Sequence, residues 1–130
     1  MSDFTISPPA VPANNGTACL LNTTYGPGTA PTAGGVGDYR GVPRKYKRAV
    51  VTVFVNQAMT FKHNVLASGS STWRTENGAG AGETVTASTL FQRDVLLFGH
   101  DNEITLVAGA AAPSTWEVTI RLVDDRALGQ

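Results

Sequence analysis

The two histidines are the residues of this chain best suited to move a proton or bind a metal. His63 follows Lys62 in an alternating segment, and His100 lies in a Gly-His-Asp-Asn run beside Asp101. A zinc site needs three or four protein ligands, and neither histidine has a second one at ligand spacing. We therefore expect His63 to be a rim or interface residue, and we expect no zinc site.

The acidic residues form two close pairs, Asp101 with Glu103 and Asp124 with Asp125. Either pair could hold a calcium ion together with backbone carbonyls, but carboxylates in turns are more commonly solvated caps. The glycine-rich segments "AGGVGDYRG" and "NGAGAGE" lack the Gly-Lys-Ser/Thr ending whose lysine and hydroxyl bind phosphate and Mg²⁺ in a P-loop. The sequence therefore predicts no metal, no cofactor and no enzyme.

Trp73 carries the main alternative, which is glycan binding. An exposed aromatic ring on a small β-sandwich can stack on a sugar, as in many carbohydrate-binding modules. Trp116 is in phase with Val118 and Ile120, so it belongs with the core. Trp73 is thus the candidate glycan-stacking residue, and packing in the core or between subunits is the competing interpretation.

A basic cluster with interleaved tyrosines, "YRGVPRKYKR", lies before the first strong hydrophobic run. The net charge of the chain is zero and eight acidic residues follow Lys47, so a nucleic acid would meet a repelling domain. We expect the cluster to contact an acidic protein neighbour instead. The candidate partner-binding residues are Tyr39, Arg40, Arg44, Lys45, Tyr46 and Lys47.

The cluster also divides the chain by composition. Residues 1–46 hold six of the seven prolines and half of the fourteen glycines, and such a segment has too few apolar side chains to fold alone. We predict an extended N-terminal arm over 1–46, a β-sandwich over 47–127 and a short tail over 128–130. The arm could add a strand to a partner's sheet edge through "TACLLNTTY".

Beyond Arg48 the hydrophobic period is two. Val50–Val55 is apolar on both faces and predicts a central strand, paired as a hairpin with "MTFKHNVLAS". Short strands follow near Trp73 and Val85, then longer strands over 90–98 and 103–109 joined by a tight connection, and a last strand from Trp116. Six or seven strands without a helix predict an all-β fold, an antiparallel sandwich or jelly roll.

The lack of a recognisable targeting signal points to synthesis in the cytosol. The start "MSDFTISPP" lacks a basic n-region and an apolar h-region, and no run of 18 apolar residues occurs. Cys19 is the single cysteine, so no internal disulfide forms. We expect no membrane partner, and we expect the sequons at Asn15 and Asn22 to be chance matches.

The stretches "VTVFVNQAMTFKHNVLASGSSTWRTENGAGAGET", "TLFQRDVLLFGHDNEITLVAG" and "STWEVTIRLVDDRA" together resemble the small β-sandwich proteins of tailed-phage structural gene sets. The resemblance is to capsid decoration, or cement, proteins and related minor virion components. It implies a homotrimeric jelly roll on the capsid surface that bridges neighbouring major capsid proteins, with no catalytic residues. A tail or neck component of the virion is the alternative within this class.

Overall fold

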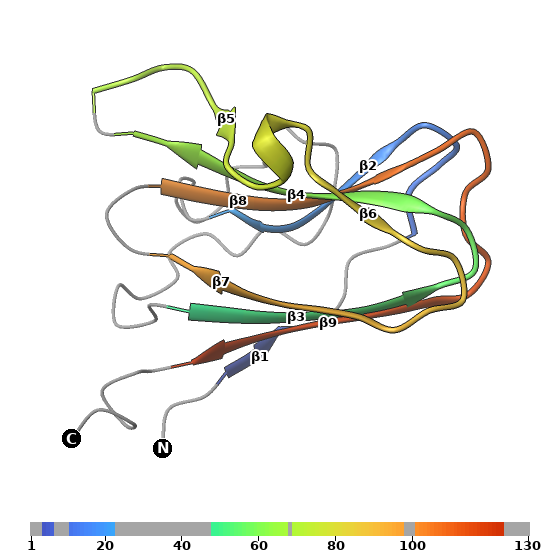
Figure 1. Cartoon of the computed structure of the whole chain (residues 1–130). Coiled ribbons are helices and arrows are strands. Elements are labelled where there is room, and N and C mark those ends of the chain that lie inside the picture. The colour runs from blue at the N-terminus through green and yellow to red at the C-terminus, as the bar shows by residue number, and fades with distance from the viewer. Residues whose placement is uncertain (1–3, 7–10, 23–47, 68, 98–100, 124–130) are drawn as a thin grey trace.

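Two antiparallel sheets face one another in the computed structural model, which describes residues 4–6, 11–22, 48–67, 69–97 and 101–123 (Figure 1). Sheet A has the strand order β1-β9-β3-β7. Its strands are β1 (Phe4–Ile6), β9 (Trp116–Val123), β3 (Arg48–Val55) and β7 (Phe91–Leu96).

Sheet B has the order β2-β8-β4-β5, and β6 pairs with β4 beside β5. Its strands are β2 (Thr17–Asn22), β8 (Asp101–Ala108), β4 (Met59–Leu66), β5 (Arg74–Thr75) and β6 (Glu83–Val85). A single turn of 3-10 helix, η1 (Gly78–Gly80), lies between β5 and β6. The described residues contain no helix long and apolar enough to cross a membrane.

Apart from β5 and β6, which both belong to sheet B, successive strands alternate between the sheets along the chain. β1, β3, β7 and β9 belong to sheet A, whereas β2, β4 and β8 belong to sheet B. This interleaving of two sheets is the arrangement of a jelly roll. The predicted all-β sandwich is therefore confirmed.

One predicted pairing is wrong. β3 and β4 do not form a hairpin, because β3 pairs with β7 and β9 while β4 pairs with β8. The strands β7 and β8, for which the sequence predicted a tight connection and no pairing, lie in different sheets. Alternation along a strand shows which side chains face the core, but a short connection can close a hairpin or cross between sheets with the same turn residues.

The core lies between the sheets and follows the alternation of the strands. Val51, Val53 and Val55 of β3 are fully buried, whereas the residues between them are half-buried. β9 is in the predicted phase, with Trp116 packed against the core at its start. Phe61 from β4 meets the β7 side chain of Phe91 across the sheets, with ring centroids 5.2 Å apart.

The sandwich begins before residue 47, contrary to the predicted boundary. β2 pairs with β8 over Thr17–Asn22, and Ala18, Leu20 and Leu21 are in the core. The strand expected to add to a partner's sheet thus adds to sheet B of its own chain. A composition averaged over 46 residues conceals this short apolar stretch, and residues 23–47 lie outside the described part.

Candidate functional site

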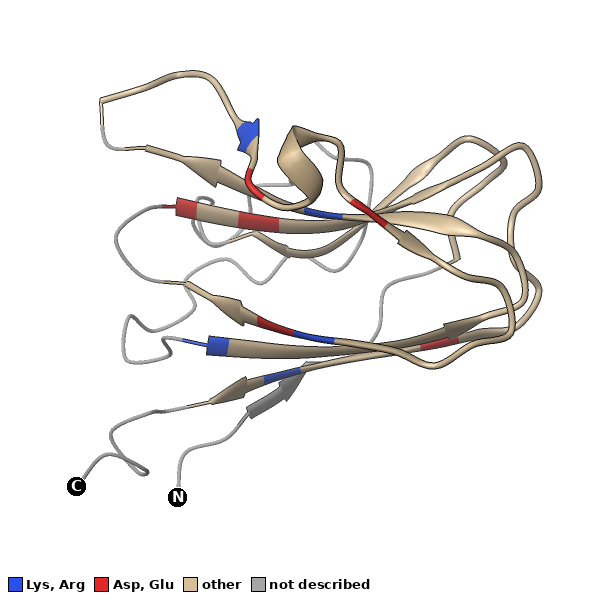
Figure 2. Ribbon diagram, in the orientation of Figure 1, with Lys and Arg blue, Asp and Glu red and all other residues tan. Residues whose placement is uncertain are grey.

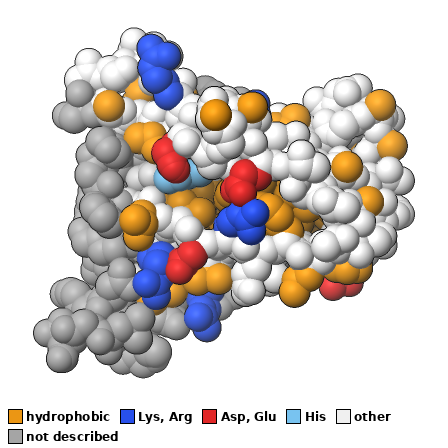
Figure 3. Space-filling view, viewed as in Figure 1, with side chains coloured by type: hydrophobic (Ala, Val, Ile, Leu, Met, Phe, Trp, Pro, Cys, Tyr) orange, Lys and Arg blue, Asp and Glu red, His pale blue; other side chains and the backbone are white. Residues whose placement is uncertain are grey.

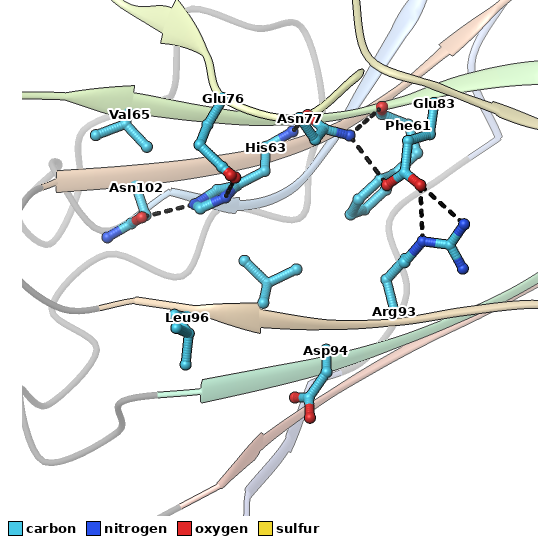
Figure 4. A pocket seen from close by; sticks show the side chains of 11 residues that line it. Phe61, His63, Val65, Glu76, Asn77, Glu83, Arg93, Asp94, Leu96 and Asn102 are labelled. Atoms are coloured by element: carbon cyan, nitrogen blue, oxygen red, sulfur yellow. Dashed lines mark hydrogen bonds and ion pairs between the residues drawn. The ribbon is translucent and has the colours of Figure 1, made fainter. Parts of the chain in front are cut away.

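A hollow of about 430 Å³ opens between β4 of sheet B and β7 of sheet A (Figures 3 and 4). Its apolar lining comes from both sheets, and its polar groups come from β4, β6, β7, β8 and the segment between β5 and β6. The described lining residues are Phe61, His63, Val65, Glu76, Asn77, Glu83, Arg93, Asp94, Val95, Leu96 and Asn102.

Asn77 holds this segment against the edge of β4. β5 pairs with β4 at Asn64 and Val65 and β6 pairs with it at Met59–Phe61, which leaves a gap in the strand pairing. The Asn77 side chain fills the gap, because its Oδ1 accepts the His63 N–H at 2.9 Å and its Nδ2 donates to the Phe61 carbonyl at 3.1 Å. One side-chain amide thus replaces a missing strand residue.

Gly82 permits the close return of the chain toward β6. Its φ is +83°, and a Cβ there would lie 2.8 Å from the Phe61 carbonyl oxygen. Glycine alone tolerates both the left-handed backbone and the close approach. This position therefore fixes how closely the segment with Glu76 and Asn77 covers β4.

His63 is buried, and its hydrogen bonds assign its tautomer. The residue is 7% exposed, so it is more enclosed than the expected rim residue, because it lies in the inward row with Phe61 and Val65. The Asn102 side chain donates to the Leu97 carbonyl at 3.1 Å, which leaves its Oδ1 as the acceptor 2.7 Å from His63 Nε2. In the neutral ring, Nε2 therefore carries the proton and Nδ1 is an acceptor.

Glu76 is the carboxylate next to that acceptor. Its Oε1 lies 3.7 Å from His63 Nδ1, and its side chain is 54% exposed (Figure 4). The distance is too long for a hydrogen bond. With the ring neutral, two acceptors face one another over the hollow.

An ion pair between Glu83 of β6 and Arg93 of β7, which we call the clasp, joins the two sheets. The Nε and Nη2 atoms of Arg93 both lie 2.8 Å from Glu83 Oε2, and the guanidinium sits 4.4 Å from the Phe91 ring centroid. The hydrogen bond from Arg93 lowers the pKa of Glu83; burial opposes this, while a hydrogen bond from Asn77 reinforces it. The clasp favours the ionised carboxylate.

Asp94 contributes to the lining but points away from the hollow in Figure 4. Its Oδ1 lies 3.1 Å from Arg48 Nε. Arg48, the member of the basic run at the start of β3, thus pairs within the fold. Among the described carboxylates of the hollow, Glu76 is the one without a fixed cation beside it.

Glu103, from the acidic pair that was weighed against a calcium site, belongs to a network on the other face of sheet B. Its Oε2 accepts a hydrogen bond from Asn22 at 3.2 Å and its Oε1 accepts one from Asn64 at 2.9 Å. Thr75 then donates to Asn64 Oδ1 at 2.7 Å. We call Asn22, Glu103, Asn64 and Thr75, which lie opposite one another on four strands, the Glu103 ladder.

The ladder explains the position of Glu103, one of the two acidic residues at the start of β8 (Figure 2). Both Glu103 oxygens are engaged by amide donors. Within the described residues, no group of three or more His, Cys, Asp or Glu side chains is arranged to hold a metal ion. Asp124 and Asp125, like His100, lie outside the described residues.

The other candidate residues have separate outcomes. Trp73 is half-buried just before β5 and does not line the hollow. The partner-binding candidates Tyr39, Arg40, Arg44, Lys45, Tyr46 and Lys47 lie outside the described part of the chain, and their role stays a prediction.

Sequence reasoning missed Glu76, Asn77, Arg93 and Asn102 as parts of one site. The Asn77-Gly78 pair signalled a turn, and the period of two along β4 could have placed His63 in the same row as Phe61, although a rim or interface position was expected. No local pattern in the sequence shows that β7 lies opposite that face of β4. The site depends on which strands oppose one another in the two sheets.

No protein-family model matches the chain, and no curated protein is significantly similar to it. A solved structure with a partial likeness is the crystal structure of PirA, with a TM-score of 0.43 and 12% sequence identity. The alignment covers 93% of this chain and 90% of that one. A likeness at this level carries no argument about function.

Proposed function

We propose that this protein is a structural component of a tailed-phage particle, a capsid decoration protein that stabilises the head by bridging major capsid protein subunits. The observation that carries the proposal is the jelly-roll order of the strands, an architecture that recurs in viral capsid domains. The sequence stretches that resemble decoration proteins span the strands from β3 to β9.

The use of polar side chains supports a structural role. The Glu103 ladder joins four strands of sheet B, the Arg93–Glu83 clasp joins the sheets, and Asn77 completes the edge of β4. Among the described lining residues of the hollow, no Ser, Thr, Cys or Lys is placed as a nucleophile beside His63. These groups hold strands together, as a protein under mechanical load requires.

The partners in this proposal are the major capsid protein and two further copies of this chain. The basic cluster at Arg44, Lys45 and Lys47 is the proposed contact with the shell. The proposed location is the outer surface of the virion.

Co-sedimentation with shells of the virus's own major capsid protein tests the proposal. The full chain should pellet with the shells. Reversing the charge of the cluster with R44E, K45E and K47E should abolish pelleting without changing the melting temperature. R74E, a reversal at the exposed strand β5, should behave as the unmodified chain. A full chain that stays in the supernatant at saturating concentration would contradict the proposal.

The assembly is tested separately by sedimentation velocity. A trimer should sediment with three times the chain mass of 13.6 kDa. A monodisperse monomer would instead favour the second candidate.

That second candidate is a carbohydrate-binding module with Trp73 as its stacking platform. Lectin domains share the jelly-roll architecture, and Trp73 is half-buried beside exposed residues of its own segment. Trp73→Ala should then abolish retention on a glycan matrix and leave the melting temperature unchanged. A large loss of stability would instead identify Trp73 as a packing residue, as expected for Trp116→Ala.

A further inference from the structure

We propose that the hollow between β4 and β7 is a binding site for a primary ammonium group carried on a short apolar stem. His63 and Glu76 would hold the ammonium group, and the apolar lining would hold the stem. This site goes beyond a shell-binding role and uses a different part of the molecule from the basic cluster.

The ammonium end of the site follows from the hydrogen bonds of His63. Asn102 fixes the proton on Nε2, so Nδ1 offers a lone pair 3.7 Å from the Glu76 carboxylate. A nitrogen placed about 2.9 Å from both acceptors would satisfy each with one N–H. An ammonium group has three such donors, whereas a carboxylate or a carbonyl has none.

Charge favours a cation over a neutral donor. The two other described carboxylates of the lining are paired, Glu83 with Arg93 and Asp94 with Arg48. The negative charge of Glu76 has no arginine or lysine of the described lining beside it. Because His63 is buried, the charge would act close to a low-dielectric wall, where it is screened less than at an open surface.

The stem end is apolar and already formed. Phe61, Val65 and Val95 line the hollow, and Leu96, which is 57% exposed, borders it. Figure 3 shows hydrophobic side chains at the bottom of the depression, with the histidine and charged side chains around it. A pocket with an apolar body and a few convergent polar groups is the usual form of a small-ligand site.

The alternative to a bound ammonium group is a proton on Nδ1 of His63 itself. Protonated His63 would direct an Nδ1–H toward Glu76 and complete an ion pair without a ligand. The two cases are distinguishable, because a ligand site requires Nδ1 to be unprotonated in the free protein.

The test is a titration of the full chain with n-pentylammonium at pH 7.5, followed by NMR of the Val65 and Val95 methyl groups. We expect a Kd on the order of 1 mM, at least about tenfold tighter than for n-pentanol, and no binding of pentanoate. Equal affinities for the three probes would show an unspecific apolar hollow and overturn the proposal.

Two further measurements make the test specific. Glu76→Gln should weaken ammonium binding by about tenfold, since a charged hydrogen bond is lost, whereas Glu117→Gln on the outer face of sheet A should not. Nitrogen NMR of His63 should show a proton on Nε2 alone. Unchanged binding by Glu76→Gln, or protons on both ring nitrogens, would overturn the site.

The ammonium group could belong to a free amine or to a lysine side chain of another protein. Nα-acetyl-lysine methylamide, titrated in parallel, distinguishes the two sources. Tighter binding than n-pentylammonium would assign a lysine, and equal or weaker binding would assign a free amine. Both results support the ammonium site.

Discussion

Glu103 and Glu76 lie on opposite sides of sheet B and show two uses of a glutamate. Glu103 is 6% exposed and receives an amide donor at each oxygen. Glu76 is exposed and faces His63 Nδ1 at a distance too long for a hydrogen bond. A carboxylate with all its partners inside the fold contributes to stability, whereas one left incomplete is available to something outside it.

The largest effect should come from removing the acceptor at the centre of the ladder. Glu103→Leu removes the acceptor of the hydrogen bonds from Asn22 and Asn64, and we expect a loss of about 3 kcal/mol in the free energy of unfolding. Denaturation in urea measures it.

Glu103→Gln is the matched control. Asn64 can turn its amide over, because the Thr75 hydroxyl can accept a hydrogen bond as well as donate one. Glu103→Gln should therefore lower the free energy of unfolding by less than about 1 kcal/mol. Equal losses for Leu and Gln would show that the ladder contributes charge rather than directed hydrogen bonds.

A smaller loss is expected at the hollow when Asn77 is removed. Asn77→Ala leaves the His63 N–H and the Phe61 carbonyl without their side-chain partner and should cost about 2 kcal/mol. Amide hydrogen exchange at His63 should accelerate, while β4 amides bonded to β8 stay protected. Uniform acceleration along β4 would mean that Asn77 supports the whole sheet rather than one gap.

The smallest effect concerns the clasp and depends on pH. The folded pKa of Glu83 lies below its ordinary value of 4.5, so its contribution is complete above about pH 4.5 and is lost as the pH falls through the folded value. Glu83→Gln should lower stability by less than about 1 kcal/mol at pH 7, because both partners are partly exposed.

The difference between Glu83→Gln and the unmodified protein should disappear in acid. Thermal unfolding over a series of decreasing pH values below pH 7 measures it, with Glu117→Gln as the control for a carboxylate on an exposed face. A difference that does not shrink anywhere in the acid range would assign the stabilisation to packing of Arg93 on Phe91 rather than to its charge.

The sequence predicted the positions of the strands better than it predicted which strands pair. The alternation in β9 placed Val118, Ile120 and Leu122 in the core correctly, because side-chain direction is a local property. The hairpin of β3 with β4 was wrong, because pairing in a jelly roll is decided between residues far apart in the chain. β2 was missed as part of the sandwich, since four apolar residues were averaged into a proline-rich segment.

The same distinction applies to the site. The inward direction of His63 follows from the period of β4, but its contacts with Asn102 and Glu76 come from another strand and from a turn. The tautomer depends on Leu97, whose carbonyl orients Asn102. No spacing in the sequence carries that information.

The order of the strands has a consequence for synthesis. β8 pairs with both β2 and β4, and β9 pairs with both β1 and β3, so each sheet is joined through one of the last two strands. A nascent chain that ends before residue 101 therefore holds two unconnected halves of each sheet. Both β8 and β9 must leave the ribosome before the two sheets can be completed, and folding should be slow and all-or-none.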